Sequence, residues 1–186
     1  MALYAIKSLG SIEEYVKIDH DFLDINDACR KSEIQFMTKE KIRIGTMESG
    51  GTEFPDLIVS GSVYLFSNTV IEQIKSEIEW YVYLKPVEIA CDVIGKKELY
   101  WLAVPPRIDC LDIDRSIIEY DWDFDLGIIP VLHCKKIVID EQLTGNFKMF
   151  KIAGVDDDNI YLDESLMDQM MSIKPEGIKF IASEGE

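Results

Sequence analysis

The sequence has few of the residues on which most metal and thiol-based catalytic sites depend. Its 186 residues include two histidines and four cysteines. The cysteines form no C-x-x-C pair and the histidines form no His-x-x-His pair, which are common spacings for zinc ligands. The residues concerned are Cys29, Cys91, Cys110, Cys134, His20 and His133. We therefore expect no metal and no cofactor, and we expect reduced, mostly buried thiols.

Long apolar runs are also missing. No stretch of about 18 apolar residues exists to cross a membrane, and the N-terminus lacks the basic and apolar regions of a secretory signal. We therefore expect a cytoplasmic protein. The turns that follow Leu65 and Leu162 contain no glycine, which argues against a phosphate-binding loop at either place.

Basic residues are scarce relative to acidic ones. Nineteen Lys and Arg face 35 Asp and Glu, which gives a formal net charge of −16. This charge opposes non-specific binding to nucleic acid or to an anionic membrane. It favours a basic protein partner, although acidic cytoplasmic proteins without such a partner are common.

The chain contains two segments with the same strand, helix and strand pattern. In residues 159–181, Asp163 is a good helix N-cap, and one apolar stripe consists of Leu166, Met167, Met170, Met171 and Ile173. In residues 63–89, Ser67 or Asn68 is the cap, and the stripe consists of Val70, Ile71, Ile74 and Ile78. The two segments are either an internal duplication or two independent common units.

The order of the expected strands and helices along the chain predicts an α+β fold, with a mostly antiparallel sheet and two or three helices packed on it. Apolar residues make up 47% of the chain, enough for a substantial core. A glycine-rich loop at residues 45–56 predicts an irregular N-terminal lobe at 1–55 and a main domain at 56–186. Further core strands are expected at residues 99–104, 137–139, 147–152 and 178–181. We expect a return strand at 81–89 interrupted at Pro86, a turn at 96–98, and a hairpin through 144–146.

The acidic run that ends in Asp121, Asp123 and Asp125 has the D-x-D-x-D opening of a calcium loop. A calcium loop of this type requires glycine at the sixth position and glutamate at the twelfth, where this chain has Leu126 and Leu132. Strand alternation explains the run better, because it places the aspartates on a solvated face. If this face binds a basic partner, the contact residues are Asp112, Asp114, Asp121, Asp123 and Asp125.

A nucleophilic couple of His133 and Cys134 is excluded by their spacing. Adjacent residues of a strand point to opposite faces, so these two side chains cannot act on one another. A Cys–His pair brought together from distant parts of the chain remains an open alternative.

The residues also resemble an immunity-protein family of bacterial polymorphic toxin systems, long known only as a domain of unknown function. The resemblance extends from about residue 56 to residue 181 and rests on the order and spacing of short segments. They include Y-L-K-P-V-E-I at 83–89, I-Y-L-D-E-S at 160–165 and G-I-K-F-I at 177–181. The other segments lie at 56–67, 100–101, 108–116, 137–141 and 150–154.

The resemblance implies a non-catalytic protein that binds a secreted or contact-delivered toxin domain and neutralises it by covering a functional surface. Such families have no fixed catalytic motif, so no site residue is carried over. Two other hypotheses remain: a regulatory module for another basic protein, and a small enzyme with a Cys/His or carboxylate site. The identity of the toxin and the oligomeric state do not follow from the sequence.

Overall fold

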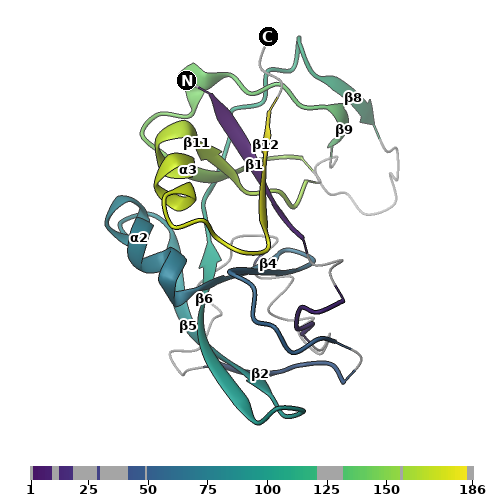
Figure 1. The fold of residues 1–186 in the computed structure, drawn as a ribbon. Coiled ribbons are helices and arrows are strands. Elements are labelled where there is room, and N and C mark those ends of the chain that lie inside the picture. The colour runs from purple at the N-terminus through teal and green to yellow at the C-terminus, as the bar shows by residue number, and fades with distance from the viewer. Residues whose placement is uncertain are drawn as a thin grey trace.

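The computed structural model of this chain describes residues 2–9, 13–18, 29, 42–48, 50–120, 132–155 and 157–183. Within these residues two five-stranded sheets and one two-stranded sheet accompany two α-helices (Figure 1). Most neighbouring strands are antiparallel. The expected α+β class is therefore confirmed. No helix in the described part of the chain is long and apolar enough to cross a membrane.

The first sheet has the order β2-β5-β6-β4-β3. Its strands are β2 (Ile42–Gly45), β5 (Tyr83–Cys91), β6 (Lys96–Val104), β4 (Val63–Ser67) and β3 (Leu57–Ser60). All neighbours are antiparallel except β2, which runs parallel to β5. Pro105 and Pro106 follow β6 directly, as expected for residues that cannot donate to a ladder.

The second sheet has the order β12-β1-β11-β10-β7. Its strands are β12 (Ile178–Ala182), β1 (Leu3–Ser8), β11 (Tyr161–Asp163), β10 (Met149–Ile152) and β7 (Arg107–Ile108). Here β7 is parallel to β10 and the other pairs are antiparallel. The small sheet pairs β8 (Ile117–Tyr120) with β9 (Leu132–Lys136), and a 3-10 helix, η3 (Glu141–Leu143), precedes β10.

Both helices begin where the sequence predicts. Helix α2 (Asn68–Ile78) is capped by Ser67, whose hydroxyl accepts the Val70 N–H at 3.3 Å. Its four predicted stripe residues are all buried. Helix α3 (Glu164–Met171) is capped by Asp163 and buries Leu166 and Met170 of its predicted stripe. The prediction is wrong for Met171, which is 47% exposed.

The two strand–helix–strand segments share one topology. In the first, β6 lies between β4 and β5, and in the second β1 lies between β11 and β12. Each inserted strand is antiparallel to both neighbours, so the two strands that flank each helix are parallel to one another. Helices α2 and α3 lie side by side and share one core with residues of both sheets (Figure 1). The internal duplication stays a prediction, and this common topology agrees with it.

The return strand of the first segment is continuous, so the predicted interruption at Pro86 is wrong. Pro86 lies inside β5, opposite Trp101 of β6. The ladder with β2 begins only at Val87, so Pro86 has no β2 residue opposite it. Proline is tolerated in a strand at such an edge, where its missing N–H breaks no ladder hydrogen bond. The turn also lies earlier than predicted, at residues 92–95 with Gly95 at φ 64°, and β6 already begins at Lys96.

The predicted strand at 137–139 and its hairpin to 147–152 are also wrong. Strand β9 ends at Lys136, and Ile139 makes one isolated bridge to Leu111. A turn does form at residues 144–146, with Gly145 at φ 60°. However, β10 then pairs with β11 and β7, because long-range partners provide its ladder.

The described part of residues 1–55 contributes two strands to the sheets. Strand β1 lies between β11 and β12, and β2 lies beside β5. Most of residues 10–41 lie outside the described part of the chain. The division into a lobe at 1–55 and a main domain at 56–186 stays a prediction.

Candidate partner-binding surface

Two of the predicted acidic contact residues occupy one turn between β7 and β8. The carboxylate of Asp112 accepts the N–H of Arg115 at 3.0 Å and lies 3.9 Å from the Arg115 guanidinium. The N–H of Asp112 donates to the Val138 carbonyl at 2.9 Å. Asp112 therefore stabilises the turn itself, whereas Asp114 is exposed beside Ile113, whose side chain is 62% exposed.

The other predicted acidic residues, Asp121, Asp123 and Asp125, lie outside the described residues. The structure thus brings Asp112 and Asp114 together, and the larger acidic face stays a prediction. The calcium-loop comparison concerns the same part of the chain, residues 121–132, of which only Leu132 is described.

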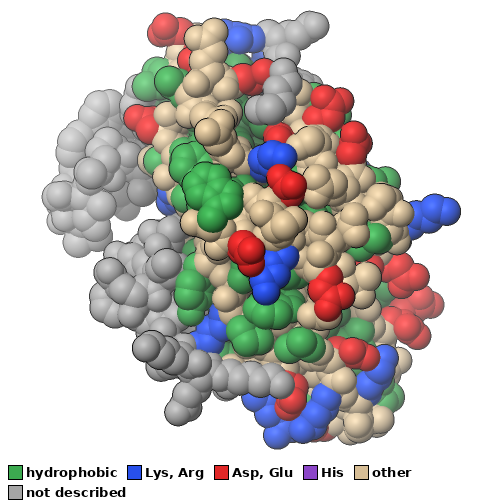
Figure 2. Space-filling view, turned by 90° about the vertical axis from the view of Figure 1, so that its left-hand side faces the viewer, with side chains coloured by type: hydrophobic (Ala, Val, Ile, Leu, Met, Phe, Trp, Pro, Cys, Tyr) green, Lys and Arg blue, Asp and Glu red, His purple; other side chains and the backbone are tan. Residues whose placement is uncertain are grey.

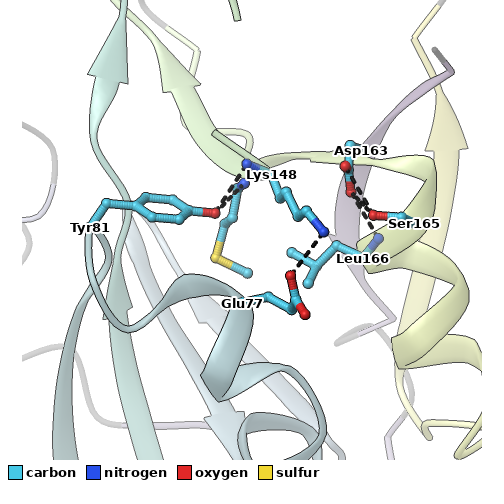
Figure 3. Close-up of polar contacts among 7 residues, drawn as sticks. Glu77, Tyr81, Lys148, Asp163, Ser165 and Leu166 are labelled. Carbon is cyan, nitrogen blue, oxygen red and sulfur yellow. Dashed lines mark hydrogen bonds and ion pairs between the residues drawn. The ribbon is translucent and has the colours of Figure 1, made fainter. Parts of the chain in front are cut away.

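A second candidate surface lies where α2 and α3 meet the segment that leads into β10. Figure 2 shows the side of the molecule that carries the two helices, where acidic and basic side chains are interspersed with hydrophobic ones. The Nζ of Lys148 donates to Oε2 of Glu77 at 2.8 Å (Figure 3). This hydrogen bond raises the pKa of Lys148 above its ordinary value. The ion pair therefore connects α2 to the start of β10.

Tyr81 holds the same two elements together from the other side of this junction. Its hydroxyl oxygen accepts the N–H groups of Lys148 at 3.0 Å and of Met149 at 3.1 Å (Figure 3). Burial raises the pKa of Tyr81 to about 12, so the phenol stays protonated at neutral pH. Tyr81 thus satisfies two backbone donors at the start of β10, and the same two hydrogen bonds fix the position of its ring.

Asp163, which precedes α3, is the third polar side chain at this junction. It is buried, and its Oδ1 accepts the Leu166 N–H at 2.8 Å, while both of its oxygens accept from the Ser165 hydroxyl (Figure 3). The first of these bonds satisfies a backbone N–H of the first helical turn, which has no partner within the helix.

Replacing Asp163 with alanine is expected to lower the free energy of unfolding by about 1–2 kcal/mol, because the α3 cap is lost. Asp163→Asn retains a side-chain oxygen at the cap and is expected to cost a few tenths of a kcal/mol. Urea denaturation of the three proteins measures the difference. Equal stability of Asp163→Ala and the wild type would show that the cap is dispensable.

A cluster of three aromatic rings, which we call the aromatic ledge, borders this junction. It consists of Trp80, Tyr81 and Phe147. The Trp80 ring centroid lies 4.4 Å from that of Tyr81, edge to face, and 6.0 Å from that of Phe147, nearly parallel. The Tyr81 and Phe147 centroids are 5.2 Å apart. Trp80 nevertheless remains 64% exposed. A shallow hollow beside the ledge is lined by Glu77, Trp80, Gly145, Asn146, Phe147, Lys148 and Asp163.

The sequence held a signal for Trp80 that the periodicity argument did not use. The buried stripe of α2 ends at Ile78, and a residue two positions further lies on the opposite side of a helix. A tryptophan placed off the stripe, directly after a capped amphipathic helix, is expected to be exposed. Its support by Phe147 comes from a segment 67 positions along the chain, which periodicity alone does not reveal.

Three of the four thiols have pKa values shifted away from those of a catalytic nucleophile. Burial raises the pKa of Cys29 to about 11 and, helped by nearby acidic groups, that of Cys110 to about 12. Burial also raises the pKa of Cys134. A reactive cysteine requires the opposite shift. His20 lies outside the described residues, and His133 is placed in β9 opposite Glu119.

Metal ligands are likewise not gathered in the described part of the chain. No three His, Cys, Asp or Glu side chains there come close enough together to hold a metal ion.

Comparison with models of protein families gives a match. The model of a family described as Immunity protein family (Imm11) matches residues 69–184, which is more than half of the chain. A search of curated proteins finds no match. The matched residues include α2 from its second residue onward, the aromatic ledge, α3 and the turn that contains Asp112 and Asp114.

Proposed function

This chain belongs to the immunity protein family Imm11, and from this premise we propose that it binds a cognate bacterial toxin domain and covers the toxin's active or substrate-binding surface. The family match is the observation that carries the proposal. Immunity proteins are generally non-catalytic, and we propose that this chain has no reaction of its own and acts in the cytoplasm of the cell that produces it.

The charge of the chain supports a basic toxin as the partner. With a formal net charge of −16, the protein attracts a positively charged domain over a distance of about one Debye length, roughly 8–10 Å. Many toxin domains act on nucleic acids and carry basic surfaces for that purpose. An acidic protein that covers such a surface competes directly with the substrate.

The acidic turn and the residues that follow it are one proposed contact surface. It comprises Asp112, Asp114, Asp121, Asp123 and Asp125. Asp114 is exposed on this turn and available to a partner, whereas Asp112 already bonds to Arg115.

Co-expression tests the proposed function directly. The toxin domain encoded beside this chain is produced in a sensitive bacterium with and without the chain. Restored growth and recovery of a one-to-one complex at low salt are the expected results, with weaker binding at higher salt. Continued toxicity together with no complex at either salt concentration would overturn the proposal.

A further inference from the structure

We infer that Trp80 anchors the toxin interface and that the hollow beside it receives an arginine side chain from a basic toxin domain. This inference rests on the proposed function, because it names the surface and the partner chemistry through which neutralisation takes place.

Trp80 combines high exposure with a fixed position. A large aromatic side chain that is 64% exposed keeps most of its apolar surface in water. Its ring still packs against Tyr81 and Phe147, at centroid distances of 4.4 and 6.0 Å. A tryptophan that is already held in place loses little side-chain entropy when a partner covers it. Tryptophan is also among the residues most enriched in the energetic centres of protein interfaces.

The residues behind the ledge make the hollow rigid. The Tyr81 hydroxyl accepts from the backbone N–H groups of Lys148, just before β10, and Met149, and Lys148 also bonds to Glu77 at 2.8 Å. Asp163 is fixed by its bonds to the first turn of α3. Three segments distant in sequence are thereby held in one geometry, which lowers the cost of ordering the surface on binding.

The charges of the hollow favour a cation that has a flat, polar head. Two carboxylates, Glu77 and Asp163, and one ammonium group, Lys148, line it, so its side chains sum to one negative charge. Lys148 donates to Oε2 of Glu77, and Oε1 of the same carboxylate is a second acceptor. An arginine guanidinium stacks on an indole face and at the same time donates N–H groups in its plane to a carboxylate. A lysine ammonium is a compact point charge without a planar head to stack on the indole, so arginine is the expected occupant.

The place of the hollow in the chain agrees with a function shared by the family. Its lining residues run from Glu77 to Asp163 and lie entirely within the matched residues 69–184. A smaller hollow near the N-terminal strands, lined by residues from Ser8 to Ser60, lies entirely outside them.

The test measures affinity for the same toxin domain that is used in the co-expression experiment. Calorimetric titration compares the wild type with Trp80→Ala, Trp80→Phe, Glu77→Gln and Val93→Ala. Val93 is the matched control, because it is also 64% exposed but lies in the β5–β6 turn. Thermal unfolding of each variant establishes that the fold is retained.

Trp80→Ala is expected to raise Kd about 30-fold or more, which corresponds to about 2 kcal/mol. Trp80→Phe, which keeps a smaller ring, is expected to lose less affinity. Glu77→Gln is expected to weaken binding several-fold and to reduce its salt dependence, and Val93→Ala to change Kd less than 2-fold. A toxin arginine that occupies the hollow is expected to show coupling: its substitution by lysine weakens binding to the wild type but not to Trp80→Ala.

The outcomes distinguish this inference from the proposed function. A wild type that binds the toxin tightly while Trp80→Ala binds equally well overturns the inference and leaves the proposed function standing. The same holds if Trp80→Ala dissociates a dimer of this chain in sedimentation equilibrium without changing toxin affinity, because the ledge then contacts a second copy. A wild type that neither binds nor protects overturns both.

Discussion

Replacing Ile74 with alanine lowers the free energy of unfolding by about 2–5 kcal/mol, the range for truncating a fully buried isoleucine. Ile74 is 0% exposed and belongs to the core cluster that unites α2, α3 and residues of both large sheets. Its loss leaves a cavity at the place where the two strand–helix–strand segments meet. Backbone hydrogen bonds hold the surrounding helices and sheets in place, so the cavity collapses only partly.

Leu166→Ala is the companion variant, because Leu166 occupies the same cluster from α3. The double variant is expected to be less destabilised than the sum of the two single variants, since both truncations enlarge one shared cavity. Gln73→Ala, on the exposed side of α2, is the matched control and is expected to change stability by less than about 0.5 kcal/mol. Chemical denaturation measures all four. A cost below 1 kcal/mol for Ile74→Ala would show that this core is loosely packed.

Replacing Lys151 with methionine is expected to stabilise the protein at pH 7, by up to about 3 kcal/mol. Lys151 lies in β10 and is 1% exposed. Its Nζ lies 3.5 Å from the Ser62 carbonyl and 5.2 Å from the centre of the Tyr64 ring. Burial lowers the pKa of Lys151 to about 8, although the charge of Asp158 acts in the opposite direction. A buried cation with so few compensating contacts therefore makes the folded protein less stable than an apolar side chain of similar length would.

The stabilisation should depend on pH in a defined direction. The pKa of Lys151 is about 10.5 in the unfolded chain and about 8 in the folded one. Below pH 8 the folded state has to carry the buried charge, so the full penalty applies, at about 1.4 kcal/mol for each unit of difference. Between pH 8 and 10.5 the folded lysine is neutral while the unfolded one still binds a proton, and the penalty disappears. The advantage of Lys151→Met should therefore shrink over this range.

Urea denaturation of both proteins at pH 7, 8, 9 and 10 tests this expectation. Buried tyrosines and cysteines also titrate at high pH, but they are common to both proteins, so the difference in stability isolates Lys151. Lys97→Met is the matched control, because Lys97 is exposed and paired with Glu88 at 3.3 Å, and its loss is expected to cost at most about 1 kcal/mol. Destabilisation of Lys151→Met at pH 7 would mean that the ammonium group makes a bond worth more than its burial costs.

Local sequence signals predicted the two helices well. Ser67 and Asp163 cap them as predicted, and the spacing of Val70, Ile74 and Leu166 identified the faces that pack into the core. The interactions that form a cap or an apolar stripe join residues only a few positions apart, so a short segment contains all the information needed to predict them. Strands β4, β6 and β12 were recognisable for the same reason, because alternation and flanking prolines or glycines are local.

Predictions that required a partner strand failed. Residues 137–139 look like a strand, yet β10 takes β11 and β7 as neighbours and leaves Ile139 with one bridge. Pro86 looks like a break, yet it is tolerated because β2 begins to pair only at the next residue. In each case the outcome depends on which distant strand is adjacent, and a short segment holds no information about that.

The α+β class, the two capped helices and their buried faces can be predicted from the sequence, because they follow from interactions between residues close in the chain. The sequence also determined the acidic balance, and its short segments resemble the family to which the chain belongs. Only the tertiary structure decided that β1 lies between β11 and β12, and that Phe147 supports an exposed Trp80 beside Glu77 and Lys148. A surface assembled from residues 77–163 exists only after long-range ladders bring its pieces together, so no local pattern can reveal it.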